Sequence, residues 1–407
     1  MTVGAGQIVL VTGPSGAGKT TLLEAIARRV GRAVRVRADG FPSDAAIIDV
    51  IAPRRPIDEA MAVLSACGLA EPRLWLRRFG ELSDGQRFRA ALARMVGEAQ
   101  HGDALIVCDE FVSLLDRPAA QAVAFNLRKL VTRRGLRLVA ATAHEDVIAD
   151  LQPDRLIRLH GDGSAAVTRR TPGRRRVSFL SRLRIAPASL RDYRRWFAAM
   201  HYRSHRQVAF VDKVFAIREP GRPQPLGIVV YAYPPLELAL RNWATGDRFR
   251  GNPGRLNREV RILRRLVVQP DLRGCGLGQW LVRQTLGWLG VEWVECLSAM
   301  GTVSAVFRRA GMRRIGRCDP SAQRRRRVAR LAALGVEPQS PDLAEQMSRR
   351  PEVERLVREA VVRWYEAAVS DGRGRAAAQS NAMLAETFRR FVGSRPVYYL
   401  WRRPGTV

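Results

Sequence analysis

Residues 13–20 read GPSGAGKT and follow the apolar run QIVLV at residues 7–11. A strand that ends in a glycine-rich turn and continues into a helix directs successive backbone N–H groups and the helix dipole at an anion. At this spacing Lys19 supplies a positive charge for the β- and γ-phosphates, and Thr20 supplies a hydroxyl for Mg²⁺. The stretch therefore predicts an α/β domain with a nucleotide site at the end of its first strand.

Three further signals follow in order along the chain. Residues 82–86 read LSDGQ at the start of a helix with an apolar face, and residues 105–110 read LIVCDE. The uniformly apolar LIVC is typical of a parallel strand buried on both faces, and it brings Asp109 next to the glycine-rich turn, where Asp109 can hold Mg²⁺ through water. Glu110 is a carboxylate beside Mg²⁺ and phosphate, where it can activate water. His144 follows the next apolar run.

In this order the four signals resemble the ATP-binding cassette (ABC) ATPases. The resemblance implies that the LSDGQ peptide completes the ATP site of a second copy in a head-to-tail homodimer, that Glu110 is the catalytic base and that His144 touches the γ-phosphate. Thr20 and Asp109 are the expected Mg²⁺ ligands. The residues expected to bind ATP are Gly13, Pro14, Ser15, Gly16, Ala17, Gly18, Lys19, Thr20 and Thr21, together with Ser83, Gly85 and Gln86.

The sequence departs from the ABC pattern in three places. No glutamine lies between Gln7 and Gln86, so the glutamine loop that usually relays to a partner is missing or replaced. No aromatic residue precedes the first strand to stack on adenine, and the stretch between Lys19 and Ser83 is short. These departures leave the prediction of ATP binding intact but argue against coupling to a membrane transporter.

Net charge divides the chain unequally. The 407 residues have room for two or three domains and carry a formal charge of +31. Residues 1–170 hold 24 Lys and Arg against 19 Asp and Glu, whereas residues 171–407 hold 45 against 19. A basic second half favours nucleic acid as a partner. Another acidic partner, or a role in solubility alone, stays open as an alternative.

Compartment and membrane association are predicted from apolar runs and cysteines. No uninterrupted apolar run approaches the length of a membrane span. The five cysteines are widely spaced and show no metal-ligand pairing. We therefore expect a cytoplasmic protein with reduced thiols and no membrane segment.

A second glycine-rich turn, at residues 273–278, follows a short apolar strand in the second half of the chain. Residues 264–286 read RRLVVQPDLRGCGLGQWLVRQTL, and residues 307–312 read FRRAGM. These stretches resemble the GNAT acyltransferases, whose motif A binds the pyrophosphate of an acyl-coenzyme A such as acetyl-CoA. The resemblance implies that the cofactor-binding residues here are Val267, Val268, Arg273, Gly274, Gly276 and Gly278. Phe307 stands where many GNAT enzymes place the tyrosine that protonates the leaving thiolate.

Candidate acid–base groups lie upstream of this turn. HYRSH at residues 201–205 holds two of the five histidines, and Asn257, Arg258 and Glu259 form a second polar group. We select Glu259 as a catalytic candidate, with a polar helix end or turn as the alternative for HYRSH. The layout of these motifs over residues 196–315 also resembles the phage Mom-type proteins, GNAT-fold relatives that modify adenine in DNA.

The predicted architecture is α/β. It consists of an ABC-type P-loop ATPase domain followed by a GNAT-fold α+β domain with a helical insertion. The expected boundaries are 1–160 for the ATPase, 161–180 for a basic linker, 181–318 for the GNAT-like domain, 319–390 for the insertion and 391–407 for a strand that returns to the GNAT sheet.

Three functional hypotheses remain. The first is an ABC-type ATPase coupled to a GNAT-fold transferase that modifies DNA or RNA with an acyl-CoA. The second gives the transferase a protein or small-molecule amine as its acceptor. The third, suggested by Phe307, is an ATP-switched nucleic-acid-binding module with an inactive transferase. Membrane transport ranks last.

Overall fold

Two compact units make up the protein. A computed structural model describes residues 2–37, 39–51, 53, 56–99, 104–173, 176–200, 208, 210–319, 322–368, 374, 378–392 and 395–405. The first unit comprises residues 1–206, 215–228 and 267–281. The second comprises residues 207–214, 229–266 and 282–407.

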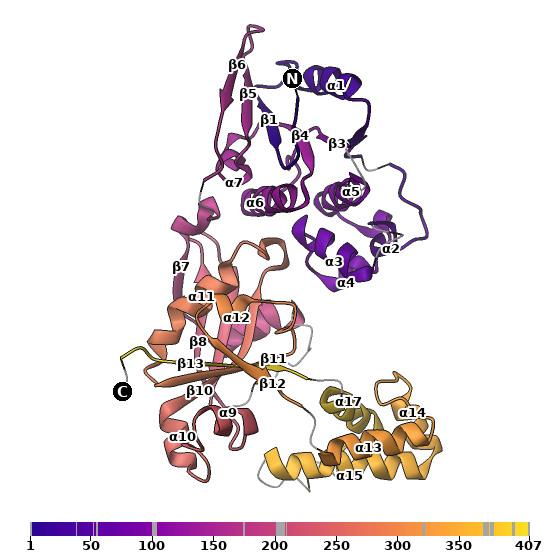
Figure 1. Ribbon diagram of the computed structural model, residues 1–407, viewed down its shortest axis with the longest axis vertical. Helices are drawn as coiled ribbons and strands as arrows, with labels where there is room; N and C mark the ends of the chain where they lie inside the picture. The colour runs from indigo at the N-terminus through magenta and orange to yellow at the C-terminus, as the bar shows by residue number, and fades with distance from the viewer. Residues whose placement is uncertain are drawn as a thin grey trace. The chain divides into compact units, whose positions relative to one another are not determined.

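The N-terminal part of the first unit is built on a six-stranded sheet with the order β2-β3-β4-β1-β5-β6 (Figure 1). Its first five strands are parallel, and β6 is antiparallel to β5. Every residue of β1 and β3 is buried, as expected for parallel strands covered on both faces. The strands are β1 (Ile8–Thr12), β2 (Ala33–Arg35), β3 (Leu105–Cys108), β4 (Arg137–Thr142), β5 (Arg155–Leu159) and β6 (Ala165–Arg169).

Helices cover both faces of this sheet. Successive side chains of β1 point to opposite faces, so Ile8 and Leu10 join a core formed with α2, α3, α5 and α6. Val9 and Val11 join a smaller core with Leu23 of α1. The helices are α1 (Lys19–Arg29), α2 (Ile47–Ile51), α3 (Ile57–Ala66), α4 (Pro72–Trp75), α5 (Asp84–Ala99), α6 (Arg117–Arg134) and α7 (Ile148–Leu151).

Helix α6 shows how local sequence fixes an element's ends. The Asp116 side chain accepts a hydrogen bond from the backbone N–H of Ala119, and Pro118 occupies the first turn. A carboxylate at this end also interacts favourably with the helix dipole. At the other end Gly135 adopts a left-handed conformation with φ of 64°.

The stretch expected as a linker, residues 161–180, is structured over much of its length. Strand β6 forms an antiparallel hairpin with β5, and Gly163 in the turn has φ of 84°. All five residues of β6 are exposed, so the segment lacks the apolar pattern that would have identified a strand. A short helical segment, Ser178–Arg182, follows and is anchored where Asp150 accepts hydrogen bonds from the Ser178 N–H (2.7 Å) and hydroxyl (2.5 Å).

A second sheet contains seven strands in the order β7-β8-β9-β10-β11-β13-β12. Strands β10 and β11 are parallel, whereas β13 lies between β11 and β12 and is antiparallel to both. The strands are β7 (Arg184–Pro187), β8 (Val211–Arg218), β9 (Gly227–Ala232), β10 (Val260–Val268), β11 (Trp293–Ser298), β12 (Arg313–Arg317) and β13 (Val397–Arg402). The helices along this stretch are α8 (Leu190–Asp192), α9 (Ala239–Ala244), α10 (Pro253–Glu259), α11 (Leu277–Leu286) and α12 (Val306–Arg309).

The parallel pair β10 and β11 separates part-way along its length. Their register joins Val260 to Trp293 and ends where Leu263 meets Cys296. Strand β10 continues to Val268, so its second half has no register with β11. That half of β10 leads directly to the second glycine-rich turn.

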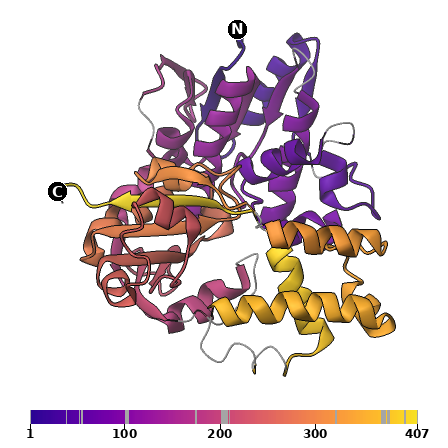
Figure 2. The same cartoon turned by 60° about the horizontal axis from the view of Figure 1, so that its bottom comes forward.

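Between β12 and β13 the chain forms helices α13 (Ala322–Ala333), α14 (Leu343–Arg349), α15 (Pro351–Ala368) and α17 (Asn381–Val392). Figures 1 and 2 show α13, α15 and α17 packed side by side. Their separate core includes Val353, Leu356, Val357 and Val361, which lie on one helix face. The side chains of Trp364 and Tyr365, later on the same helix, lie outside the described residues. No helix in the described ranges is both long enough and apolar enough to cross a membrane.

A buried ionic cluster joins the second sheet to α9. The guanidinium of Arg241 lies 3.2 Å from the carboxylate of Glu295, and both side chains are fully buried. The Tyr398 hydroxyl donates to the other carboxylate oxygen at 2.9 Å. Burial raises the pKa of Glu295, although Arg241 and Tyr398 act in the opposite direction. The bond from Tyr398 ties β13 to β11 by side chains as well as by strand pairing.

Candidate functional site

The first glycine-rich turn connects the end of β1 to the start of α1. Gly16 and Gly18 have φ of 79° and 85°, a region that residues with a side chain rarely adopt. No atom lies within 4 Å of the position that a Cβ would take at either glycine. At Gly13 a Cβ would come within 2.5 Å of the Leu159 carbonyl oxygen, so close approach of β5 also requires glycine. Pro14, Ser15, Ala17 and Thr21 lie on the same turn and first helical turn.

Lys19 reaches back across this turn from the first position of α1. Its ammonium group donates to the carbonyl oxygens of Gly13 at 2.9 Å and Pro14 at 2.7 Å. The positive charge therefore lies beside the glycine-rich backbone, near the N–H groups at the start of the helix. This arrangement is suited to binding an anion.

Thr20 and Asp109 meet at the ends of two different elements. The Thr20 hydroxyl on α1 donates to a carboxylate oxygen of Asp109, which follows β3, at 2.7 Å. Two oxygen ligands held this closely fit Mg²⁺, which prefers oxygen and keeps several of its waters. The other carboxylate oxygen of Asp109 accepts from the backbone N–H of Glu110 at 2.9 Å.

Glu110 lies in an unusual backbone conformation. Its φ is 47°, and Val112 two residues later has φ of 56°. Such conformations cost residues with a Cβ roughly 1–2 kcal/mol each. The Ser113 hydroxyl donates to the Glu110 carbonyl at 2.8 Å, which helps to hold the turn. The exposed Glu110 side chain therefore sits on a strained turn beside Asp109, which is a common feature of functional sites.

His144 comes to the same edge of the sheet. Thr12, the last residue of β1, is in register with Thr142, the last residue of β4. His144 follows two residues later, and its backbone N–H donates to the Thr142 hydroxyl at 3.1 Å. Because β1 and β4 are parallel, His144 and the glycine-rich turn leave the sheet at the same end.

A polar network lies beside His144, and no motif in the sequence indicates it. One carboxylate oxygen of Glu145 accepts from the Thr12 hydroxyl at 3.1 Å and from the Arg158 guanidinium at 2.9 Å. The hydrogen bond from Arg158 is the main reason that the pKa of Glu145 is lowered. Arg158 lies on β5, so only the strand order reveals this pairing.

The LSDGQ peptide begins helix α5. The Gln86 side chain accepts from the backbone N–H of Ser83 at 3.1 Å, and Ser83 is exposed. A Cβ at Gly85 would lie 3.0 Å from a Leu115 methyl group and 3.2 Å from the Leu114 carbonyl oxygen. The glycine therefore lets the start of α5 pack closely against the loop after Glu110.

A family model described as an AAA ATPase domain matches residues 2–140. The lipoprotein-releasing system ATP-binding protein LolD of Novosphingobium aromaticivorans is 33% identical over 192 residues, which cover 38% of this chain and 83% of LolD. This chain belongs to the ABC ATPases. The zinc import ATP-binding protein ZnuC of Ruegeria pomeroyi is 32% identical over 176 residues and 39% of this chain.

The ABC ATPase similarity covers less than half of the chain. The chain spans 66% of the length of ZnuC and 27% of the tylosin resistance ATP-binding protein TlrC of Streptomyces fradiae, which is 34% identical over 154 residues. Among solved structures, the dimeric MJ0796 ABC transporter cassette covers 42% of this chain and 89% of its own, with 21% identity and a TM-score of 0.35.

The second glycine-rich turn lies beyond the ABC ATPase region, in the same compact unit. Gly274 and Gly276 have φ of 86° and 85°, and α11 begins at Leu277, with Gly278 in its first turn. Val267 and Val268 end the preceding strand β10. The Arg273 guanidinium donates to the carbonyl oxygens of Ala70 at 2.5 Å and Val268 at 3.2 Å. The Arg273 side chain is thus already engaged with protein groups.

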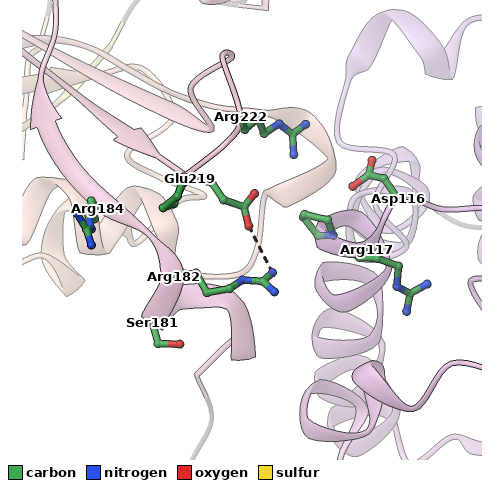
Figure 3. A pocket seen from close by; sticks show the side chains of 9 residues that line it. Asp116, Arg117, Ser181, Arg182, Arg184, Glu219 and Arg222 are labelled. Atoms are coloured by element: carbon green, nitrogen blue, oxygen red, sulfur yellow. Dashed lines mark ion pairs between the residues drawn. The ribbon is translucent and has the colours of Figure 1, made fainter.

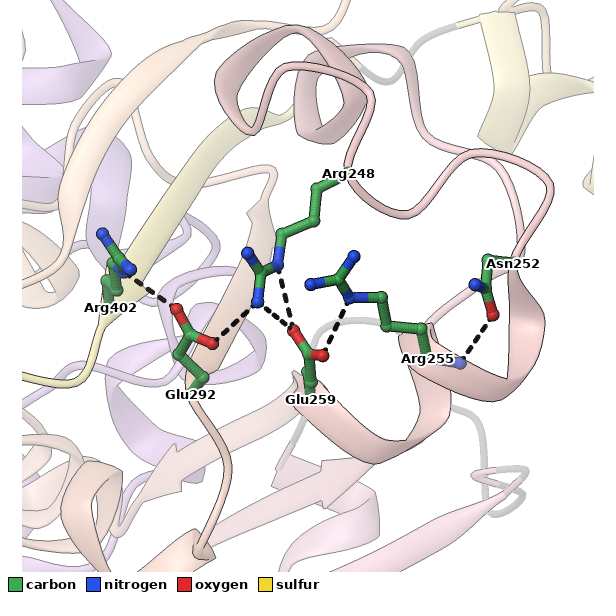
Figure 4. A network of polar contacts seen from close by, with 6 residues as sticks. All are labelled: Arg248, Asn252, Arg255, Glu259, Glu292 and Arg402. Atoms are coloured by element: carbon green, nitrogen blue, oxygen red, sulfur yellow. Dashed lines mark hydrogen bonds and ion pairs between the residues drawn. The ribbon is translucent and has the colours of Figure 1, made fainter. Parts of the chain in front are cut away.

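Glu259, the catalytic candidate in the second half of the chain, has the surroundings of a structural residue (Figure 4). Its carboxylate accepts from the guanidinium groups of Arg248 at 2.9 Å and Arg255 at 2.9 Å. Burial opposes ionisation, but these bonds prevail and lower the pKa of Glu259. Arg248 also reaches Glu292, which pairs in turn with Arg402. A carboxylate engaged by two guanidinium groups is a poor proton acceptor.

Phe307 is buried and packs against Tyr399, with ring centroids 5.5 Å apart. The Tyr399 hydroxyl donates to the Gly301 carbonyl at 3.0 Å, so it is engaged in a structural bond. The candidate group HYRSH at residues 201–205 lies outside the described residues. Phe307 has no acidic proton, and the hydroxyl of its neighbour Tyr399 is already used in a hydrogen bond to the protein.

An open pocket of about 700 Å³ in the first unit is rich in arginine (Figure 3). Arg182 pairs there with Glu219 at 3.4 Å, and Arg117 pairs with Asp146 outside the lining. Arg184 and Arg222 have no carboxylate partner among the described residues. The pocket is lined by Asp116, Arg117, Pro118, Ser181, Arg182, Arg184, Glu219, Pro220 and Arg222.

Proposed function

We propose that this protein binds and hydrolyses ATP and couples that cycle to a GNAT-fold transferase that uses an acyl-CoA to modify nucleic acid. The observation that carries the ATPase part is the meeting of Lys19, Thr20 and Asp109 around the first glycine-rich turn. In this proposal Lys19 and the turn amides bind the phosphates. Thr20 and Asp109 would hold Mg²⁺, which neutralises developing charge on the phosphates.

The remaining ATPase residues have roles in hydrolysis and assembly. Glu110 orients and deprotonates the attacking water, and His144 contacts the γ-phosphate. Ser83, Gly85 and Gln86 complete the ATP site of a second copy, where the amides at the start of α5 face the γ-phosphate. The exposure of Ser83 supports this role, because an interface residue must be accessible in the free protomer. ATP would then join two protomers head to tail, and hydrolysis would release them.

The strand arrangement of the second sheet supports the transferase part. The parallel strands β10 and β11 are connected through α11, so the start of α11 follows the carboxyl end of β10. Beyond Leu263 the β11-facing edge of β10 has no strand register, and an extended ligand with amide groups can add to such an edge. Next to that edge, Gly276 and the amides at the start of α11 are suited to a pyrophosphate.

Charge supports nucleic acid as the acceptor. The base excess falls in residues 171–407. The pocket offers positive charge to a phosphate backbone through Arg184 and Arg222, which have no carboxylate partner in the part of the chain that the structure describes. Each guanidinium that neutralises a phosphate releases counterions, which makes binding salt-dependent. Binding of duplex DNA and of RNA should be measured by fluorescence anisotropy at salt concentrations from about 50 to 200 mM. Over that range the affinity of a protein that contacts several phosphates falls by about 10³–10⁵-fold.

The arginine pocket has a matched control. Arg184→Ala and Arg222→Ala should each reduce the slope of log affinity against log salt by about 1. Arg349→Ala, which removes an exposed arginine paired with Glu345, should leave the slope unchanged. Binding that ignores salt would remove nucleic acid from the proposal.

The acyl-CoA site is tested by a pair of substitutions at one glycine. Gly276→Ala and Gly276→Asp both place a side chain at a backbone position with φ of 85°, and aspartate tolerates that conformation better than alanine. Only the second substitution places a carboxylate next to the expected pyrophosphate. Calorimetric titration with acetyl-CoA should give a much greater loss of affinity for Gly276→Asp. DNA or RNA is then treated with the wild-type protein, ATP and acetyl-CoA and digested to nucleosides, and mass spectrometry of these nucleosides identifies the product. Unchanged nucleosides would exclude nucleic acid as the acceptor.

A second candidate function is an ATP-switched nucleic-acid-binding protein with an inactive transferase fold. Phe307 supports it, because a buried phenylalanine has no proton to donate to a leaving thiolate. Salt-dependent nucleic-acid binding with no affinity for any acyl-CoA would select this candidate. Acyl transfer to amines, with none to nucleic acid, would instead select a protein or small-molecule acceptor.

A further inference from the structure

The second glycine-rich turn is held by side chains of the ABC ATPase helices within the first unit. The Asn126 side-chain amide on α6 donates to the Arg273 carbonyl at 2.9 Å, and the Lys129 ammonium donates to the Gly274 carbonyl at 2.6 Å. A Cβ at Gly274 would lie 2.7 Å from the Asn126 side-chain oxygen. Helix α6 therefore contacts the carbonyl side of the turn so closely that only glycine fits.

Helix α5 contacts the residues just before the turn. The Arg89 guanidinium lies 2.5 Å from the carboxylate of Asp271, and 7% of the Arg89 side chain is exposed. The same guanidinium donates to the carbonyl oxygens of Gly68 at 2.9 Å and Gly85 at 3.0 Å. Gly85 is the glycine of the LSDGQ peptide, so one arginine links that peptide to the approach of the second turn.

Two of the side chains that make these contacts are buried, whereas the Asp271 side chain is 44% exposed. Arg89 and Asn126 are each 5% exposed, and Cys275 beside them is 8% exposed. Burial also raises the pKa of the Cys275 thiol to about 12. Loss of Asp271 would leave the buried Arg89 without its carboxylate, which is costly in a poorly solvated site. The set Arg89, Asn126, Lys129 and Asp271 is called the turn clasp below.

We propose that the turn clasp transmits the nucleotide state of the ABC ATPase to the second glycine-rich turn. The LSDGQ peptide is the part expected to engage ATP across the dimer, and any shift of Gly85 changes the position of Arg89. Arg89 passes that shift to Asp271, while Asn126 and Lys129 hold the turn itself. The chain has no glutamine between Gln7 and Gln86 and therefore lacks the usual glutamine loop. The turn clasp would take over its role by connecting the ATPase to the second glycine-rich turn.

The clasp leaves the amide side of the turn available. Its two bonds to the turn itself, from Asn126 and Lys129, go to the carbonyl oxygens of Arg273 and Gly274. The first amides of α11 have no acceptor inside the helix. ATP can therefore order or release the anion-binding face without competing for it. If the second turn binds acyl-CoA, as in the proposed function, the affinity for acyl-CoA depends on bound ATP. The affinity for ATP must then depend on bound acyl-CoA by the same factor.

Hydrogen exchange of the full chain tests the clasp directly. The measured peptide covers residues 266–281, with and without ATP and Mg²⁺, in a Glu110→Gln background that blocks hydrolysis. We expect ATP to change the exchange rate of this peptide by about fivefold or more. Asp271→Asn should abolish that change, because Arg89 loses its charged partner. Lys129→Met, a milder change at a partly exposed side chain, should reduce it.

A matched acid-to-amide control is Asp247→Asn, which removes an exposed partner of Arg250. This variant should keep the full response to ATP. An unresponsive wild-type peptide, or a full response in Asp271→Asn protein that binds ATP normally, would overturn the proposal. If ATP changes the exchange rate but acetyl-CoA does not bind, the clasp stands and the transferase proposal fails. The two failures are therefore distinguishable.

Discussion

The chain contains two glycine-rich turns that join a strand to a helix, and their surroundings differ. Around Gly16 and Gly18 no atom lies within 4 Å of a built Cβ, whereas Gly274 is pressed against Asn126. The first turn has its own lysine, Lys19, while the lysine at the second turn comes from another helix. Similar backbones thus carry different tasks, because the first turn is open to a ligand at Gly16 and Gly18, whereas the second is in contact with another helix at Gly274.

The comparison separates two reasons for a glycine. Positive φ demands glycine in both turns, and it can be anticipated from the spacing of glycines before a helix. Close approach demands glycine at Gly274 but not at Gly276, and it depends on what packs there.

The largest effect is expected at the lysine of the open turn. Lys19→Ala should weaken ATP binding by about 100-fold, because a charge-assisted contact worth roughly 3 kcal/mol is lost. Isothermal titration calorimetry measures the affinity. Lys213→Ala should bind ATP normally, since Lys213 donates to the carbonyl oxygens of Trp288 and Leu289. Equal ATP affinity in Lys19→Ala and wild-type protein would contradict the assigned site.

Ser83→Arg should abolish the ATP-dependent dimer while the monomer still binds ATP. The long cation would occupy the start of α5, where a second copy must approach the γ-phosphate. Analytical ultracentrifugation in a Glu110→Gln background measures the dimer fraction. Ser43→Arg, another exposed serine, is the control and should dimerise. A dimer that persists in Ser83→Arg protein would place the interface elsewhere.

Gly274→Ala should destabilise the protein more than Gly276→Ala. The two glycines have nearly equal φ, so each substitution carries a conformational cost of about 1–2 kcal/mol. Only Gly274 is close to Asn126, which adds about 1–3 kcal/mol from overpacking. Urea denaturation measures the free energy of unfolding of each variant.

This pair of substitutions also has a second-site check. Asn126→Ala should recover part of the extra cost of Gly274→Ala, because the crowded amide is removed, and should recover none of the cost of Gly276→Ala. Equal destabilisation by the two glycine substitutions would mean that the close approach at Gly274 does not exist in solution.

The smallest effect concerns Glu259, beside Arg248 and Arg255. Glu259→Gln should lower the free energy of unfolding by about 1–2 kcal/mol at pH 7, because two charge-assisted bonds are weakened. The folded-state pKa of Glu259 lies below its unfolded value of about 4.3. Its contribution is therefore present above that value and is lost as the pH falls through the folded-state pKa.

Urea denaturation at neutral and acidic pH measures this contribution. The difference between wild-type and Glu259→Gln protein should shrink in acid. A variant with unchanged stability at every pH but no transferase activity would support Glu259 as a catalytic residue.

Local sequence predicted the segments around the first glycine-rich turn because each of them is short and contiguous. The turn from Gly13 to Thr20, the strand before Asp109 and the LSDGQ helix each follow from residue spacing. Their meeting could be anticipated because parallel strands end at one edge. The Glu145–Arg158 pair could not, because nothing in either segment indicates its partner across the sheet.

Polar residues within the apolar faces of two helices could have indicated the turn clasp from the sequence. Arg89 lies within the apolar run of α5, and Asn126 interrupts AVAFNL in α6. A buried polar group needs a partner, so each position implied a contact. The contact partner lies 182 residues along the chain from Arg89 and 147 residues from Asn126, which is beyond the reach of any local sequence pattern.

The sequence by itself determined the two glycine-rich turns, the positions of their strands and helices, and the unequal distribution of charge. These features depend on backbone conformation and local spacing, which neighbouring residues encode. Only the tertiary structure decided that Glu259 is engaged by two arginines and that Gly274 lies against Asn126. The reason is physical: a side chain's protonation and freedom depend on the groups that folding brings to it, and those groups are distant in the chain.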